Sequence, residues 1–232
     1  MTTLPAGTVT FLFTDIEGST RLLRDLDERY GELISQHRRA LREVAAEHGG
    51  IEIDAQGDAF FFTFSRARDA VAAAIAAQRR LAGERWPADA EPKVRMGLHT
   101  GEPGVAEEGY VGIDVVRGAR LTAAAHGGQI LVSEPTRTLL PAELPDGARI
   151  VDLGEHMLKD MDRPERLFQV EAPGLRTDFG APRAEKSAAD DPLGERIDHY
   201  VQKQLDDAFR SIDLEESDRK SARWRRILGR DR

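Results

Sequence analysis

Two acidic residues stand where short apolar segments of the chain end. Asp15 follows the segment TVTFLFT at residues 8–14, and Asp58 lies in the turn between segments 51–54 and 59–64. Carboxylates at the ends of neighbouring strands could share hard divalent cations such as Mg²⁺, which prefer carboxylate oxygens and substrate phosphates. Spacing alone leaves another interpretation open, in which Asp15 caps the next helix and Asp58 is an ordinary turn residue.

The elements that would position these acids can be predicted from residue patterns. Segment 8–14 is rich in β-branched and aromatic residues and predicts a buried strand, and apolar residues at helical spacing predict a helix from about residue 20 to 48. Segments 51–54 and 59–64 predict a β-hairpin. The other expected elements are helices at 67–81, 112–125 and 135–140 and strands at 94–100, 129–132, 148–153 and 167–171. This order predicts an α+β fold whose antiparallel-rich sheet carries helices on one face.

Composition excludes several classes of protein. The 232 residues include 33 basic and 41 acidic side chains, and the net charge of −8 argues against nucleic-acid binding by the whole chain. The absence of cysteine excludes disulfides, zinc thiolates and cysteine nucleophiles. The longest apolar run, Ala70–Ala77, is far shorter than the roughly 18 residues of a membrane span. The first residues lack the basic region of a signal peptide, so we expect a cytoplasmic protein.

The composition changes near residue 172. Residues 172–193 are rich in Pro, Gly, Ala and charged residues, which predicts a flexible linker between a domain at 1–171 and a tail at 194–232. The tail begins with an amphipathic helical stripe, which could pack on the domain, pair with its copy in a dimer or dock a partner. Its end, 219–232, holds seven Arg or Lys around Trp224, which suits either a solvated end or contact with an anionic membrane surface.

Five sequence motifs occur in order within residues 8–171, about 70% of the chain. They are FLFTDIEGST, QGDAFFFTF, VRMGLHTGEP, GYVGIDVVRGARL and LGEHMLKD. Together they resemble the class III nucleotidyl cyclase catalytic domain, whereas the P-loop, GxGxxG and HExxH patterns are absent. The resemblance implies a ferredoxin-like α+β fold with helices packed around an antiparallel-rich sheet.

The resemblance also implies a role for particular residues. Asp15 and Asp58 match the family's metal carboxylates, and Ile16 matches the residue whose carbonyl binds the second of two Mg²⁺ or Mn²⁺ ions. Arg120 matches the arginine that meets the transferring phosphate, and Lys159 matches the lysine for the terminal phosphates. The residues that match the triphosphate side are Phe11, Thr14, Glu17, Gly18, Ser19 and Thr20. After Lys159 the family usually has Gly, whereas this chain has Asp160.

The implied reaction is attack of the ribose 3′-hydroxyl on the α-phosphorus of a nucleoside triphosphate, with loss of pyrophosphate. Two metal ions would activate the hydroxyl and clamp the reacting oxygens, and the arginine and lysine would offset phosphate charge. In the family, one protomer supplies the acids and the other supplies the arginine. The resemblance therefore implies a homodimer with two interfacial sites and a role in intracellular signalling.

Three positions depart from the family's pattern. Asp54 stands at the base-selecting lysine, Gly109 at the base-selecting acid, and Val116 at an asparagine that serves the transition state. An ionised Asp54 only accepts hydrogen bonds, so it favours guanine by bond count. The family makes ATP the common substrate, and its pyrimidine cyclases, which make cUMP or cCMP in antiphage defence, also depart from the purine pattern. Loss of the amide predicts turnover slower by about 10²–10³ unless Arg117 replaces it.

Three functional hypotheses follow from these observations. The first is a metal-dependent nucleotidyl cyclase, a phosphorus–oxygen lyase that makes a cyclic nucleotide. The second is a degenerate cyclase domain that binds a nucleotide or a partner and regulates without turnover. The third is a plain α+β interaction domain, which five ordered motifs make improbable. The departures at Asp54, Gly109 and Val116 favour the second, and the retention of both acids with Arg120 favours the first.

Overall fold

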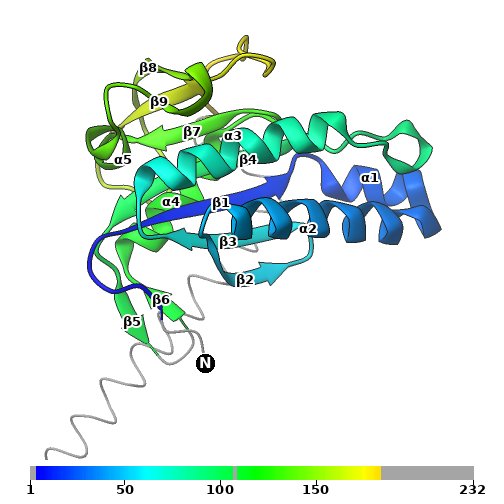
Figure 1. The fold of residues 1–232 in the computed structure, drawn as a ribbon, viewed down its shortest axis with the longest axis horizontal. Helices are drawn as coiled ribbons and strands as arrows, with labels where there is room; N and C mark the ends of the chain where they lie inside the picture. The colour runs from blue at the N-terminus through cyan, green and yellow to red at the C-terminus, as the bar shows by residue number, and fades with distance from the viewer. Residues whose placement is uncertain (1–3, 107–108, 184–232) are drawn as a thin grey trace, which may run out of the picture.

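The computed structural model describes residues 4–106 and 109–183 of the chain. Its main sheet has seven strands in the order β2-β3-β1-β4-β7-β9-β8, and a separate two-stranded hairpin projects from the body of the domain (Figure 1). The main strands are β1 (Val9–Ile16), β2 (Ile51–Gln56), β3 (Ala59–Phe64), β4 (Val94–Gly101), β7 (Ile130–Ser133), β8 (Arg149–His156) and β9 (Glu165–Glu171). The small hairpin consists of β5 (Gly104–Ala106) and β6 (Gly109–Val111).

The pairing within the main sheet is mostly antiparallel. Strand β1 lies between β3 and β4 and runs antiparallel to both, and β4 and β7 are a parallel pair. Strands β7, β9 and β8 continue the sheet in antiparallel pairs. The predicted α+β fold with an antiparallel-rich sheet is therefore confirmed.

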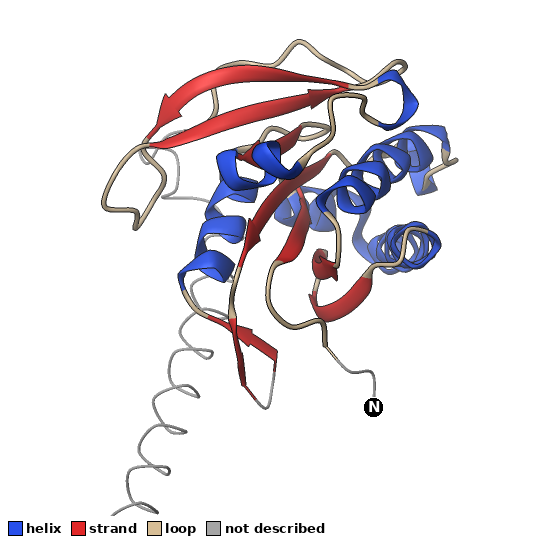
Figure 2. Cartoon of the chain, turned by 60° about the vertical axis from the view of Figure 1, so that its left-hand side comes forward, coloured by secondary structure: helices blue, strands red, loops and turns tan. Residues whose placement is uncertain are grey.

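Helices cover both faces of the sheet, so the prediction of helices on one face is wrong. Helices α2 (Tyr30–Glu47) and α3 (Ala67–Gly83) pack on the face that carries Leu12 and Phe62. Helix α4 (Ile113–Ala124) packs on the opposite face, against Phe11 and Phe13. Figure 2 shows helices on both sides of the sheet. The reason is that all eight residues of β1 are buried, which requires apolar cover on each side of that strand.

The predicted helix from 20 to 48 is divided into two. Helix α1 (Ser19–Leu26) ends at Asp27, whose backbone adopts φ 47°, and a 3₁₀ turn (Asp27–Arg29) leads into α2. No glycine or proline marks this break, and Asp is one of the residues that tolerate positive φ. The apolar periodicity runs through both helices, so it predicts one element where the backbone makes two.

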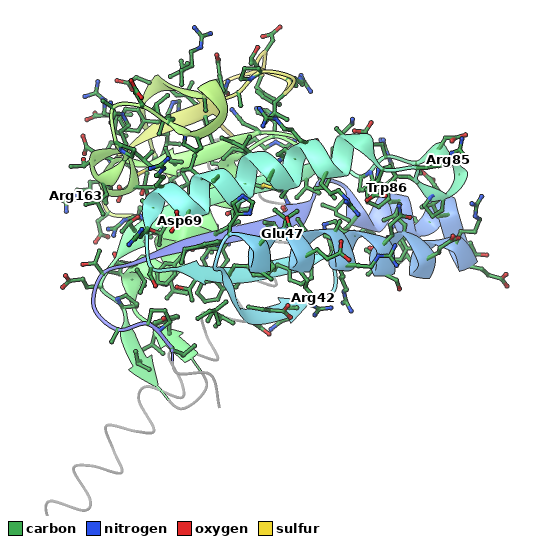
Figure 3. All side chains as sticks on the ribbon, viewed as in Figure 1. Arg42, Glu47, Asp69, Arg85, Trp86 and Arg163 are labelled. Atoms are coloured by element: carbon green, nitrogen blue, oxygen red, sulfur yellow. The ribbon has the colours of Figure 1, made fainter. Side chains whose placement is uncertain are left out.

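Helix α2 is tied to the β2–β3 hairpin that follows it. Arg42 donates to both carboxylate oxygens of Glu52, with N–O distances of 2.6 and 2.7 Å, and its guanidinium lies 5.2 Å from the centre of the Phe60 ring. Figure 3 labels Arg42 at this side of the sheet. One turn earlier on α2, Arg38 donates two hydrogen bonds to the carbonyl oxygen of Gly57 in the hairpin turn.

The remaining predicted elements are present with small changes at their ends. Helix α5 (Glu134–Leu139) follows β7, and β8 and β9 form the hairpin at the edge of the sheet (Figure 1). The β5–β6 hairpin was not expected, because each of its strands has only three residues and begins with a glycine. No helix within 4–106 and 109–183 combines the length and the apolar character that crossing a membrane requires.

The first part of the expected linker lies against the domain. The Arg183 N–H donates to the Ala124 carbonyl at 2.9 Å, and His126 Nε2 lies 2.9 Å from the Ala181 carbonyl oxygen. The Phe179 ring stacks on His126. Linker residues 184–193 and the tail expected at 194–232 lie outside the described residues.

Candidate active site

The two predicted metal carboxylates lie at the same end of the sheet. Asp15 is the penultimate residue of β1, and Asp58 lies in the two-residue turn between β2 and β3. The backbone N–H of Ile16 donates to Asp58 Oδ2 at 3.0 Å. Asp58 therefore lies beside Ile16, the residue that follows Asp15. Both acids are buried, with exposed fractions of 3% and 1%. Antiparallel pairing of β1 with β3 thus brings together Ile16 and Asp58, which are 42 residues apart in sequence.

Asp15 also takes part in a buried ion pair that the sequence analysis did not identify. Arg95 on β4 donates from Nε to Asp15 Oδ1 at 2.7 Å and from Nη2 to Oδ2. The side chains are 2% and 4% exposed. The antiparallel register places the two residues directly opposite each other. A charged residue within the apolar segment VRMGL was the available signal, because a buried charge requires a partner.

Helix α2 supports the turn that carries Asp58. The two hydrogen bonds from Arg38 hold the Gly57 carbonyl, one residue before the acid. His37, the preceding residue of α2, is fully buried, and both of its ring nitrogens lack a hydrogen-bond partner among the described residues. Burial lowers the pKa of His37 to about 4, although the negative charge of Asp58 acts in the opposite direction. His37 is therefore neutral near pH 7.

A turn after β1 leads directly into the first turn of α1. Gly18 adopts the left-handed conformation (φ 68°), and no side chain caps the helix that begins at Ser19. The N–H groups at such a helix start can hold phosphate oxygens. Thr14 lies nearby on β1, and its buried hydroxyl has no hydrogen-bond partner within the described residues. Ser19 is buried and Thr20 is partly exposed in this turn.

Phe11 is not part of this turn. It lies four residues before Asp15, which is about 13 Å along a strand that rises about 3.3 Å per residue. Its ring is fully buried and packs edge-on against Phe61, with a centroid distance of 5.3 Å, and against Tyr110. The structure therefore assigns Phe11 to the core that supports β1 rather than to the turn.

Helix α4 carries Arg120 and approaches the sheet closely. A Cβ atom at Gly97 of β4 would lie 2.6 Å from the backbone nitrogen of Thr122, and one at Gly118 would lie 2.8 Å from the Phe13 ring. Thr122 Oγ1 also donates to the Phe13 carbonyl at 3.4 Å. These contacts fix the helix against β1 and β4 and so determine where Arg120 is presented.

The Arg120 side chain is 3% exposed and forms an ion pair with Asp160 through Nη2. Asp160 follows Lys159 in the loop between β8 and β9, which Figure 3 marks by Arg163. Lys159 is partly exposed in the same turn. The structure thus brings Arg120 and the Lys159–Asp160 pair together, 40 residues apart in sequence. Asp15 and Arg120 belong to two different ion pairs.

The two positions that were expected to select the base, Asp54 and Gly109, lie on strands β2 and β6. Asp54 accepts hydrogen bonds from the Ala55 N–H at 2.9 Å and from the side-chain amide of Gln56 at 3.0 Å. Gly109 has φ 132°, and a Cβ atom there would lie 3.4 Å from Ile53. A side chain at position 109 would therefore be strained, which explains why an acid is not accommodated there.

The suggestion that Arg117 replaces the missing amide at Val116 finds no support in its contacts. Its Nη1 lies 2.8 Å from Asp114 Oδ1, and its Nε lies 2.9 Å from Glu165 Oε1. The hydrogen bond from His99, together with Arg117, lowers the pKa of Asp114. Arg117 therefore belongs to a polar network that joins α4 to β4 and β9.

Asp15 and Asp58 make a small donor set. Across the described residues, no group of three or more His, Asp or Glu side chains gathers around a common point. Two carboxylates and a nearby main-chain carbonyl suit Mg²⁺ or Mn²⁺, which complete their coordination with water and phosphate oxygens. The residues present therefore fit hard divalent cations that are held jointly with a phosphorylated substrate.

Comparison with known proteins identifies relatives of the whole domain. Residues 1–171 match the family described as the adenylate and guanylate cyclase catalytic domain. The chain is 37% identical over 199 residues to an uncharacterized protein of Mycobacterium tuberculosis, covering 85% of this chain and 67% of that protein. It is 29% identical to an adenylate cyclase of Podospora anserina, across 72% of this chain but only 10% of that protein.

Solved structures show the same fold. The adenylyl cyclase CyaB from P. aeruginosa is 26% identical, with a TM-score of 0.59 over 75% of this chain and 97% of that chain. Adenylate cyclases from Trypanosoma brucei in their monomeric state superpose with a TM-score of 0.71 at 23% identity, over 78% of this chain and 95% of that chain. At that identity the second comparison bears on the fold alone.

Proposed function

Because the chain belongs to the adenylate and guanylate cyclase catalytic domain family, we propose that it converts a nucleoside triphosphate to a 3′,5′-cyclic nucleotide and pyrophosphate. The observation that carries this proposal is that Asp15 and Asp58, two buried acids, lie at the same end of the sheet, where Asp58 accepts a hydrogen bond from the residue after Asp15. A domain that only binds a partner has no need for two buried acids beside the start of a helix. Residues 1–171 would form the catalytic domain.

The chain's own residues would bind and orient the substrate. Asp15, Asp58 and the Ile16 carbonyl would hold two Mg²⁺ or Mn²⁺ ions, which when bound acidify the attacking hydroxyl and offset phosphate charge. The N–H groups that follow Gly18 at the start of α1 would bind the terminal phosphates. Ser19 and Thr20 lie in this first helical turn and offer hydroxyl groups to the same oxygens.

Arg120 and Lys159 would act on the other side of the triphosphate. Charge that develops on the transferring phosphate in the transition state is stabilised by positioned guanidinium and ammonium groups. Asp15 and Arg120 belong to different ion pairs within one protomer, which suits a site completed by a second copy. Val105 and Ile113, on β5 and at the start of α4, are 57% and 56% exposed and offer apolar contacts for such a dimer.

The test is a turnover assay with each nucleotide offered separately. The full chain is incubated with Mn²⁺ and ATP, GTP, CTP or UTP, and cyclic product is detected by mass spectrometry. We expect product from at least one nucleotide and none from Asp58→Ala or Arg120→Ala. The same assay decides the base, for which Asp54 favours guanine, the family's common substrate is ATP, and the antiphage relatives use pyrimidines.

Complementation tests the interfacial arrangement. Asp58→Ala and Arg120→Ala are each expected to be inactive, and mixing them creates heterodimers with one intact site. At equal amounts, half of the dimers are mixed and each has one of two sites, so about a quarter of wild-type activity returns. No recovery on mixing, with both variants folded and dimeric, would place the two residues in the same protomer's site or refute their roles.

The second candidate function is nucleotide binding without turnover. Val116 replaces an amide expected in the transition state, and the Arg117 side chain is engaged by Asp114 and Glu165 instead. We therefore expect slow catalysis. Binding of a nucleotide without product from any of the four, by folded dimeric protein, would establish this second function in place of the first.

A further inference from the structure

The ion pair between Arg120 and Asp160 joins two side chains in very different environments. The Arg120 side chain is 3% exposed, whereas the Asp160 side chain is 53% exposed. A buried guanidinium needs an anion, because an unpaired charge in the protein interior is costly. The carboxylate has no such need, since water can solvate it where it lies. Moving the Asp160 carboxylate into water should therefore cost much less free energy than moving the Arg120 guanidinium, so another anion can take the place of Asp160 beside Arg120.

The turn that carries Asp160 is anchored on α4. The Met161 N–H donates to the Leu158 carbonyl at 3.2 Å, which closes a turn with Lys159 and Asp160 at its centre. Leu158 is 3% exposed and packs with Leu121 and Ala124 of α4. Leu121 is the residue that follows Arg120 in the chain. The turn thus holds the carboxylate at the guanidinium while leaving it open to solvent.

The backbone at Asp160 adopts a conformation that favours other residues. Its φ of 60° lies in the left-handed region, and the third position of such a turn favours Gly or Asn. An L-residue with a larger side chain pays about 1–2 kcal/mol there. The ion pair with Arg120 offsets this cost, so the aspartate has a specific contact that a glycine would lack.

The charges at this place define what the exchange would do. Lys159 and Arg120 are cations and Asp160 is an anion, so these three side chains together carry one net positive charge. Phosphate groups bind guanidinium groups through paired hydrogen bonds of the same geometry as a carboxylate. A polyphosphate and the Asp160 carboxylate are therefore alternative ligands for Arg120.

We propose that Asp160 competes with the substrate's phosphates for Arg120 and thereby sets the affinity of this chain for its nucleotide. The proposal rests on the proposed function, in which Arg120 meets the transferring phosphate. Asp160 is not a catalytic residue here, because it leaves Arg120 when the phosphate binds. By competing for Arg120, Asp160 raises the concentration of nucleotide at which the site is half saturated.

The test measures binding of inorganic pyrophosphate in the presence of Mg²⁺, by titration calorimetry on the full chain. Asp160→Asn removes the charge and keeps a residue that tolerates positive φ. We expect it to bind pyrophosphate about three- to tenfold more tightly, the range for loss of a competing, partly exposed ion pair. Asp160→Gly should show the same gain.

Two further variants make the measurement specific. Asp152→Asn is the matched control, because Asp152 forms an exposed ion pair with Arg166 in the same β8–β9 hairpin, and it should leave the affinity unchanged. In an Arg120→Ala background, Asp160→Asn should give no gain, since the shared ligand is absent. A gain that persists in that background would overturn the proposal, because it would reflect general charge alone.

Equal or weaker binding by folded Asp160→Asn would also overturn it and would make Asp160 a residue that orients Arg120. If no variant binds pyrophosphate, the proposal is also overturned, because release of Arg120 from Asp160 would then not increase the affinity for phosphate groups. Failure of the proposed function is distinguishable. If Asp160→Asn binds pyrophosphate more tightly but no nucleotide is cyclised, competition for Arg120 stands and the cyclase activity does not.

Discussion

Replacing Asp15 tests the structure before it tests the chemistry. Asp15 and Arg95 form a bidentate ion pair whose side chains are 4% and 2% exposed. Removing one member of a buried pair leaves the other without its counter-charge and costs about 3–5 kcal/mol. We expect Asp15→Ala to lower the free energy of unfolding by that amount, a large fraction of the 5–15 kcal/mol by which domains are typically stable.

The assay is equilibrium unfolding in urea at neutral pH without added metal, followed by circular dichroism. Asp58→Ala is the comparison, because the Asp58 carboxylate accepts a hydrogen bond from the Ile16 N–H. We expect a smaller cost there, about 1–3 kcal/mol for a buried donor left without its acceptor. The double variant Asp15→Ala/Arg95→Met should be more stable than Asp15→Ala, since the buried charge is removed together with its partner.

A free energy of unfolding for Asp15→Ala within about 1 kcal/mol of wild type would refute this reasoning. It would mean that water or another group solvates Arg95 as well as the carboxylate does. If the loss is as expected, an inactive Asp15→Ala protein does not by itself demonstrate a metal ligand, because the substitution also destabilises the fold. Asp58→Asn is then the better variant for metal dependence.

Three further predictions concern the elements that support the site. Arg38→Ala removes two hydrogen bonds to the hairpin turn, so we expect half-maximal activity to need several-fold more Mn²⁺, whereas Arg39→Ala on the exposed side of α2 should have no effect. Gly97→Ala should destabilise the domain by about 1–3 kcal/mol through the clash with α4, measured by urea unfolding, whereas Gly83→Ala meets open space and should be neutral. Burial lowers the pKa of His37 from 6.5 to about 4. Below pH 6.5 the unfolded chain therefore binds a proton at His37 that the folded chain does not bind. The free energy of unfolding should fall by up to about 3 kcal/mol between pH 7 and pH 4. Unfolding curves of His37→Leu should lack that part of the slope.

Much of the fold could be predicted because its elements carry dense local signals. The apolar segments that became β1, β3 and β4 and the alanine-rich α3 were located to within a few residues. The break at Asp27 was missed because its residue types are compatible with a helix and only tertiary packing separates α1 from α2. The position of α4 on the second face was missed because helix periodicity shows that a face is apolar, not which side of the sheet it covers.

The site was predictable where it follows the chain and not where it depends on contacts between distant segments. Asp15 and Asp58 stand at strand ends, a position visible in sequence. The contacts that hold these two acids in place are not visible in the sequence. Arg95 is 80 residues from Asp15, and Arg38 reaches the hairpin turn from helix α2. Asp160 was visible as a departure from the family's pattern, but its contact with Arg120 required coordinates.

Under the proposed function, ligand binding at this site would exchange one charged partner for another, because the charged side chains are already paired. Asp15 is already paired with Arg95, and Arg120 with Asp160, so the proposed cation and phosphate would each compete with a group of the chain. The two exchanges differ in cost. Asp160 is half exposed and can move into water, whereas the Arg95 side chain is 2% exposed and has too little contact with solvent to replace its partner. Arg95 would therefore stay beside Asp15, and a metal ion bound there would share the carboxylate oxygens with the guanidinium. Because a shared carboxylate is a weak metal ligand, we expect the nucleotide's phosphates to supply much of the affinity, and we expect metal and nucleotide to bind best together.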